Sequence, residues 1–223
     1  MEFKNLSDFF PVLVPAILIA TVCTAVGSAW INHLYSKAPA ELLSFPEGIT
    51  SRAIYRKPLL FLLLAACIVK ISITTTPPTF FYWIAAIVLL SFVTVTDFEQ
   101  YVIFDAMLLP FAVVGFAYTI HMELPVANHI VAALGGGLLF FILTIITKGA
   151  IGGGDIKLIA SMGLWLGVRP MLSVITYGFI TGGLAALFLL ITKQKSRHSY
   201  FAYGPYFALS GAGILLGLIR LLF

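Results

Sequence analysis

Two aspartates stand out in a chain that otherwise avoids charge. Asp155 follows three glycines, Gly152 to Gly154, between two apolar runs, while Asp97 lies at the end of another apolar run. An ionisable side chain within an apolar membrane segment is costly, so a functional role is the default hypothesis for each aspartate. The glycines leave the backbone free of side-chain bulk and able to adopt positive φ.

Two such carboxylates offer proton transfer. When they are held close in a poorly hydrated site they cannot both ionise, so one keeps a proton. The ionised partner can take a proton from a water molecule that attacks a peptide carbonyl, and the protonated partner can donate to the carbonyl oxygen. This is the working part of an aspartic protease. Ser/His or Cys/His chemistry is not expected, because no histidine lies near a suitable nucleophile in the sequence.

Each charged residue near these aspartates also has a simpler interpretation. Asp155 could be an ordinary N-terminal capping residue of the next helix, and Asp97 could be an interfacial residue. The triple glycine and a shared membrane face favour a joint function for the two carboxylates. Lys157 is either a residue that tunes catalysis or a positively charged membrane anchor. Asp105 and Glu99 are expected to be solvated loop charges.

The composition fixes the fold class. Of 223 residues, 61% are hydrophobic and 10% charged, and the mean hydropathy is +1.06. A soluble domain would carry roughly a quarter charged residues. Apolar runs of membrane-spanning length recur along the chain, which predicts an all-α polytopic membrane protein with about eight transmembrane helices. We expect residues 1–223 to form a single integral membrane domain in which residues 32–57 are a short polar loop.

The eight helices are expected at 9–31, 58–76, 79–96, 104–120, 129–147, 156–168, 171–192 and 201–223. The sixth is short: its 13 residues reach about 20 Å, against a hydrocarbon core of about 30 Å. Its N-terminus, beside Asp155, should therefore lie within the bilayer region, where non-helical backbone must line a protein-covered or water-filled cavity. Arg169 and Pro170 are expected to end this helix.

Lysine and arginine residues predict the orientation. With eight spans, nine of them fall on one side of the membrane and four on the other, so the first side should be cytoplasmic and both termini outside. Asp97, Asp105 and Asp155 then share the cytoplasmic side. The net charge of +4 is interpreted as topology-setting loop charge and not as a nucleic-acid surface. Neither the two cysteines nor the four histidines form a pattern that predicts a metal site.

Five stretches resemble the type IV prepilin peptidases, over nearly the whole chain. Residues 96–105 (TDFEQYVIFD) are similar to the first aspartate motif of that family, and residues 152–158 (GGGDIKL) are similar to its GxGD motif, which preflagellin peptidases and presenilins share. Further likenesses are residues 203–208 (YGPYFA), which resemble a late F-G-P segment, and the stretches 27–28 (GS) and 55–59 (YRKPL).

The resemblance implies an eight-helix GxGD aspartyl protease of the bacterial cytoplasmic (inner) membrane. Such an enzyme removes the basic leader from prepilins or pseudopilins at the cytoplasmic face, within the lipid bilayer. Many members then N-methylate the new terminus with S-adenosylmethionine, whereas proteolysis needs no cofactor. On this likeness Asp97 and Asp155 are the catalytic pair. The expected supporting or substrate-binding residues are Gly152, Gly153, Gly154, Lys157, Asp105, Gly204 and Pro205.

The chain departs from the family pattern at two places. Phe104 stands where the family usually has proline before its second aspartate. Residues 32–57 lack the paired CxxC motifs with which many members bind zinc in this loop, so no zinc is expected and methylation is less firmly implied.

Two other function classes remain open. A proton- or ion-coupled transporter could use buried aspartates beside a broken helix, but it predicts internal repeats and the two halves do not match. A structural protein of a pilus or secretion assembly would not need both aspartates, and both are present.

Overall fold

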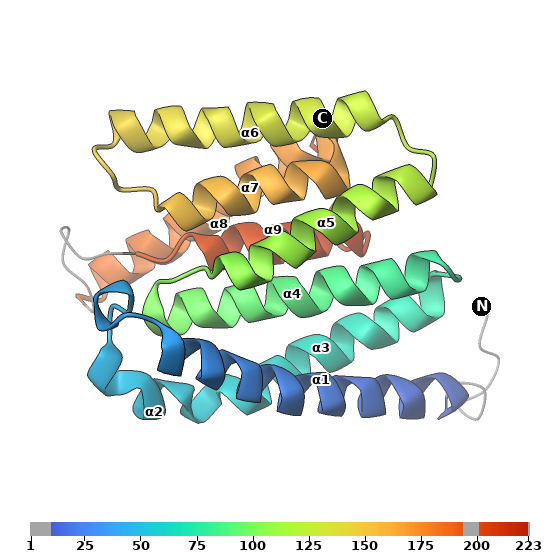
Figure 1. Ribbon diagram of the computed structural model, residues 1–223, viewed down its shortest axis with the longest axis horizontal. Helices are drawn as coiled ribbons and strands as arrows, with labels where there is room; N and C mark the ends of the chain where they lie inside the picture. Colours follow the sequence, from blue (N-terminus) through green and yellow to red (C-terminus); the bar gives the residue numbers. More distant parts are fainter. Residues whose placement is uncertain (1–9, 194–200, 223) are drawn as a thin grey trace. The chain divides into compact units, whose positions relative to one another are not determined.

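The computed structural model describes residues 10–193 and 201–222, which contain helices and no strand (Figure 1). The helices are α1 (Phe10–Lys37), α2 (Ile49–Arg52), α3 (Arg56–Thr74), α4 (Thr79–Gln100), α5 (Asp105–His121), α6 (Val126–Ile146), α7 (Gly153–Leu166), α8 (Val168–Ile191) and α9 (Gly204–Leu215). Short 3-10 turns η2 (Ala40–Leu42), η3 (Pro46–Gly48) and η4 (Ala53–Tyr55) occupy the loop after α1. Parts of the earlier predictions lie outside the described residues, namely Phe9, Phe223 and the charges Lys4, Lys195 and Arg197.

The helices confirm an all-α polytopic membrane protein. Within residues 10–193 and 201–222, five segments are long and apolar enough to cross a membrane: Phe10–Lys37, Pro46–Thr74, Thr79–Gln100, Val126–Ile146 and Val168–Ile191. The fourth predicted segment is the shorter apolar helix α5. The sixth and eighth are α7 and α9, whose 14 and 12 residues reach only about 21 and 18 Å.

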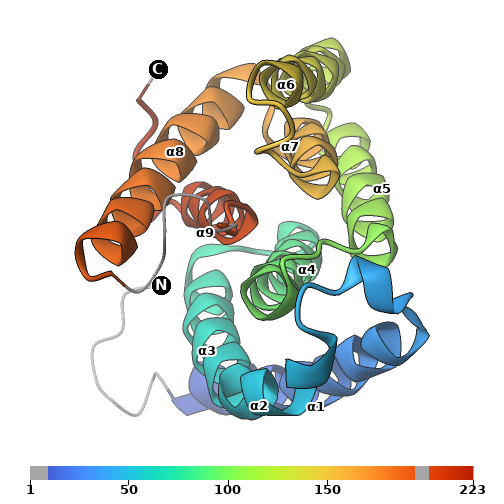
Figure 2. The same cartoon turned by 90° about the vertical axis from the view of Figure 1, so that its left-hand side faces the viewer.

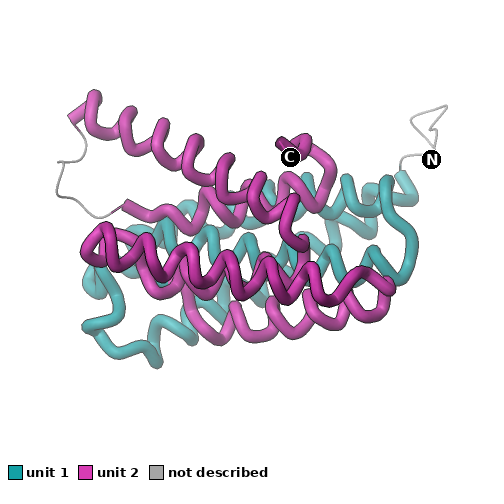
Figure 3. The backbone as a smooth tube through the Cα atoms, turned by 90° about the horizontal axis from the view of Figure 1, so that it is seen from above, with its two compact units in different colours: residues 1–102 teal, residues 103–223 magenta. Residues whose placement is uncertain are grey.

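Two compact units divide the chain, residues 1–102 and residues 103–223, shown in separate colours in Figure 3. In the first unit α1 packs along α3, and α3 packs on α4 (Figure 2). In the second unit α7 contacts α5, α6, α8 and α9, so it is the helix that the others surround. The prediction of a single domain over residues 1–223 stays a prediction.

Close packing between α6 and α7 depends on Gly163. A Cβ atom there would lie 2.4 Å from the backbone nitrogen of Ala133, which is closer than any two such atoms come. On the opposite side of α7, the Trp165 ring stacks on the rings of Phe111 and Tyr118, and its Nε1 donates to the Phe111 carbonyl at 2.7 Å. These contacts hold α7 between α5 and α6, and with it the segment that begins at Gly152.

The boundary between α7 and α8 corrects the sequence prediction. Arg169 and Pro170 do not end the sixth helix; they lie in the first turn of α8. The break is at Gly167, whose φ of +73° and ψ of −177° form a conformation that essentially only glycine adopts. Pro170 is accommodated because the first turn of a helix does not use its backbone N–H groups for intrahelical bonds.

A matched pair of glycine substitutions tests the α6–α7 contact. Gly163→Ala should lower the free energy of unfolding by about 1–3 kcal/mol, because the added methyl group must push α7 away from the α6 backbone. Gly135→Ala, on the open side of α6 where a Cβ meets no atom within 4 Å, should change it by less than about 1 kcal/mol. Denaturant unfolding of the purified variants in detergent checks this, and equal stabilities would contradict the close packing.

Candidate active site

The last turn of α4 carries Asp97. The sequence placed the end of this helix at residue 96, but the helix continues through Gln100, so Asp97 and Glu99 are both helical. Tyr101, with a φ of +54°, ends the helix, and its N–H donates to the Asp97 carbonyl at 3.0 Å. The Asp97 side chain is buried, with 6% of its surface exposed.

Glu99 is not the solvated loop charge that the sequence suggested. It is buried and forms an ion pair with Arg56, the first residue of α3, which is only 2% exposed. The Arg56 Nη2 lies 2.6 Å from the Glu99 Oε2, and the Nε lies 2.9 Å from Oε1. A buried carboxylate is tolerated here because a guanidinium group matches it with parallel hydrogen bonds.

Three polar groups of α1 complete this network. The Tyr35 hydroxyl donates to the Glu99 Oε2 at 3.0 Å, and the Arg56 Nη1 donates to the Asn32 Oδ1 and to the Ser28 carbonyl. The stretches 27–28, 55–59 and 96–105, which are far apart in the sequence, therefore meet at one ion pair. Sequence reasoning missed this cluster; the available signal was an arginine and a glutamate within two of the family-like stretches.

The loop after α1 also contacts the end of α4. The Gln100 side chain accepts from the Phe45 N–H at 2.9 Å and donates to the Phe45 carbonyl at 3.0 Å, as a paired strand residue would. The Arg52 Nη1 donates to the Glu99 carbonyl at 3.1 Å, and the Arg52 guanidinium stacks over the Phe45 ring. The Arg52 bond satisfies a carbonyl group that the end of α4 leaves without a helical partner, and the Gln100 bonds satisfy the backbone of the loop at Phe45.

Asp155 lies in the first turn of α7. Its Oδ2 accepts from the Gly152 N–H at 3.2 Å, so the simpler interpretation of Asp155 as a capping residue describes one of its oxygens. Its Oδ1 is buried and has no hydrogen-bond partner among the described residues. A buried oxygen without a partner is costly, and such groups in native proteins call for an explanation.

The three glycines before Asp155 differ in what they require. Gly152 has a φ of −72°, which any residue adopts, so positive φ is not the reason for glycine there. A Cβ at Gly154 would lie 2.9 Å from the Cβ of Ile103, whereas one at Gly153 would meet no atom within 4 Å. Gly154 is therefore needed for close packing within the unit, while the backbone at Gly153 is open to an approaching group.

Lys157 and Asp105 form an ion pair at the N-terminal ends of α7 and α5. The Lys157 Nζ lies 2.7 Å from the Asp105 Oδ2, and both side chains are more than half exposed. They lie at a cavity of about 480 Å³, whose remaining lining residues are Ala106, Leu108, Leu109, Ala112 and Ser161. Pairs this exposed stabilise a fold by at most about 1 kcal/mol, so the arrangement of the two helices owes more to packing.

Gly204 and Pro205 are buried at the start of α9. The neighbouring rings pack against the small residues of α8: a Cβ at Gly178 would lie 2.1 Å from the Phe207 ring, and one at Gly182 would lie 2.9 Å from the Tyr203 ring. The segment is thus a point of tight contact between α8 and α9. That Gly204 and Pro205 support substrate binding stays a prediction.

The two aspartates belong to different units, Asp97 to the first and Asp155 to the second. Their proximity is therefore still a prediction from the sequence. Within residues 10–193 and 201–222, no group of three His, Cys, Asp or Glu side chains is arranged to hold a metal ion.

Comparison with known proteins finds a family match over the region that contains both aspartates. Residues 83–187 match the model of the type IV leader peptidase family. The chain is 29% identical over 122 residues to the prepilin leader peptidase/N-methyltransferase of Dickeya chrysanthemi, covering 52% of this chain and 43% of that protein. It is 30% identical over 124 residues to the protein of that name from Neisseria gonorrhoeae, covering 53% and 42%. No solved structure matches the chain.

These matches are partial. A further relative of the same name, from Bacillus subtilis, is 29% identical over 86 residues, which cover 39% of this chain and 34% of that protein. The chain therefore spans less than half the length of the curated relatives it matches. Asp97, Asp105, Asp155 and Lys157 all lie within the matched residues 83–187.

The different surroundings of Gly153 and Gly154 predict different responses to the same change. Gly154→Ala should lower the free energy of unfolding by about 1–3 kcal/mol, because Ile103 must move. Gly153→Ala should stay within about 0.5 kcal/mol of the original chain, because its Cβ enters open space. Thermal unfolding of both variants in the same detergent compares them, and a larger loss for Gly153→Ala would contradict the arrangement.

Proposed function

We propose that this chain is an intramembrane aspartic endopeptidase acting on prepilins or pseudopilins, because residues 83–187 match the type IV leader peptidase family. The observation that carries the proposal is the position of both Asp97 and Asp155 within the matched segment. Asp97 lies in the last turn of α4 and Asp155 in the first turn of α7.

The proposed reaction uses the two carboxylates as one unit. One carboxylate, ionised, takes a proton from the attacking water, and the other, protonated, donates to the carbonyl oxygen of the scissile peptide. The buried Oδ1 of Asp155, which has no partner among the described residues, is suited to exchange a proton with water or substrate. Because the two groups are coupled, their proton belongs to the pair and not to either residue.

The substrate must present an extended backbone to this pair. A helical segment has its carbonyl groups bonded, so it must unwind before attack, and glycine at the cleavage point helps because it is a poor helix former. The open backbone at Gly153 supports an approach of that kind beside Asp155. In this proposal Gly152 and Gly154 shape the turn, and the Lys157–Asp105 pair flanks it.

We place the site at the cytoplasmic face of the bacterial inner membrane, with both termini outside. The support is the excess of lysine and arginine on that side of the predicted topology. Methylation of the new N-terminus with S-adenosylmethionine is a second proposed activity, supported by the names of the relatives. A transporter has no comparable support, because α4 carries its aspartate in the last turn and the shorter α7 carries its aspartate in the first.

Substitution of the aspartates tests the protease. Purified Asp97→Ala and Asp155→Ala variants should lose cleavage of a prepilin-derived peptide with a basic leader, because each removes half of the proton-transfer pair. Asp105→Ala should keep at least part of the activity, because its carboxylate is exposed and paired with Lys157. Mass spectrometry reads the loss of the leader, and full activity of either of the first two variants would refute the assignment.

The same assay separates the second activity. With S-adenosylmethionine present, a methyltransferase would add about 14 Da to the cleaved product, because each transferred methyl group replaces a hydrogen. A product of unchanged mass would remove methylation from the proposal and leave the protease intact.

A further inference from the structure

The Arg56–Glu99 ion pair is costly to build. Both side chains are buried, with 2% of Arg56 and 7% of Glu99 exposed. The free-energy cost of removing two ions from water offsets most of the stabilisation from their mutual attraction. Apolar residues of similar volume are often as stable or more stable in such positions. Stability by itself is therefore a weak reason for placing this pair in the interior of an apolar helical unit.

The ion pair fixes the orientation of both side chains. The Arg56 guanidinium donates from Nε, Nη1 and Nη2, so its plane is fixed by Glu99 on one side and by Asn32 and the Ser28 carbonyl on the other. Glu99 also accepts from the Tyr35 hydroxyl. Parallel bonds of this kind restrain orientation as well as distance, in a way that apolar contacts do not.

The restrained residue lies next to the proposed chemistry. Glu99 is two residues after Asp97 in the final turn of α4, a part of a helix that frays easily when nothing holds it. Arg56 begins α3, so the pair fastens the end of α4 to the start of α3 and to α1. Gln100, bonded to Phe45, holds the residue that follows.

We propose that Arg56 and Glu99 are positioning residues, which hold the last turn of α4 so that the Asp97 carboxylate has one orientation. The inference rests on the proposed protease function. It adds that the acid–base group is aligned by an ion pair in the same unit, and that one partner of this pair, Arg56, lies outside the family-matched residues 83–187. Neither residue touches the substrate in this proposal.

An apolar replacement separates positioning from stability. The double variant Arg56→Met/Glu99→Leu fills similar volume without charges, so it should fold with an unfolding temperature equal to or above that of the original chain. Its kcat on the prepilin-derived peptide should fall about tenfold or more, with KM within about twofold, because misplacement of a catalytic group slows the chemical step. Hydrogen exchange of the amides at 98–101 should become faster, while exchange in residues 153–166 stays unchanged.

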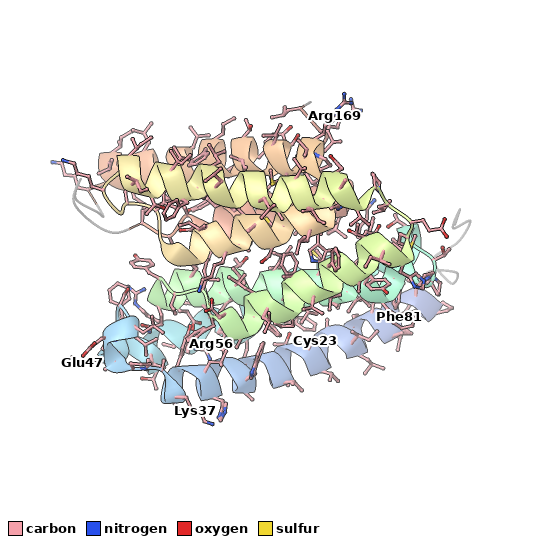
Figure 4. All side chains as sticks on the ribbon, turned by 45° about the horizontal axis from the view of Figure 1, so that its top comes forward. Cys23, Lys37, Glu47, Arg56, Phe81 and Arg169 are labelled. Atoms are coloured by element: carbon pink, nitrogen blue, oxygen red, sulfur yellow. The ribbon has the colours of Figure 1, made fainter. Side chains whose placement is uncertain are left out.

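A matched control replaces an exposed cation and an exposed carboxylate by the same two apolar residues. Lys37 and Glu47, labelled with Arg56 in Figure 4, are exposed at the end of α1 and in the following loop. Lys37→Met/Glu47→Leu should keep kcat, KM and amide exchange at the values of the original chain. A conservative single variant, Arg56→Lys, should give an intermediate kcat, because an ammonium group keeps the charge but not the parallel bonds.

The outcomes distinguish this inference from the function on which it rests. If the original chain does not cleave the peptide, the protease proposal fails and the positioning role fails with it. If the original chain cleaves, Asp97→Ala does not, and Arg56→Met/Glu99→Leu cleaves with an unchanged kcat, then only the positioning role is overturned. Slower cleavage by the double variant with unchanged exchange at 98–101 would also overturn it.

Discussion

The need to give each backbone polar group a hydrogen-bond partner without water is the main constraint on this structure. In an apolar environment every backbone N–H and C=O needs a partner within the protein, and a helix provides all of them except at its ends. The side chains that do not suit a bilayer are gathered at those ends. Arg52 bonds the Glu99 carbonyl where α4 stops, and the Gln100 side chain bonds the Phe45 main chain. Thr119 and His129 both bond the Leu164 carbonyl near the end of α7.

Within this arrangement the two aspartates have contrasting settings. Asp97 is in the final turn of a 22-residue helix whose end is tied to an ion pair and to a loop. Asp155 is in the first turn of a 14-residue helix, and one of its oxygens is buried without a partner in the described part of the chain. The end of α4 is therefore held by neighbouring side chains, whereas the Asp155 Oδ1 has no hydrogen-bond partner among the described residues.

The family match covers only part of the chain, and the structure describes contacts outside that part as well. The matched residues 83–187 include both aspartate motifs but not Tyr35, Asn32 or Arg56, which surround Glu99. The family likeness therefore covers both aspartates, whereas the contacts within the first unit show what holds the last turn of α4. Because the matches span less than half of the relatives' length, the second kind of statement has to come from the contacts of this chain itself.

The sequence by itself determined the helical membrane class and the approximate helix positions, because run length and charge avoidance are local properties. The roles of Asp97 and Asp155 stay predictions. The sequence could not show that Glu99 is buried, since that depends on an arginine 43 residues earlier in the chain. It could not tell Gly153 from Gly154, since only the position of Ile103 distinguishes them. It placed the end of the sixth helix at residue 168, before Arg169 and Pro170, because proline is a stronger local signal than Gly167, where the fold breaks the helix at a positive φ. Tertiary packing decided these points because each is set by an atom that arrives from a distant part of the sequence.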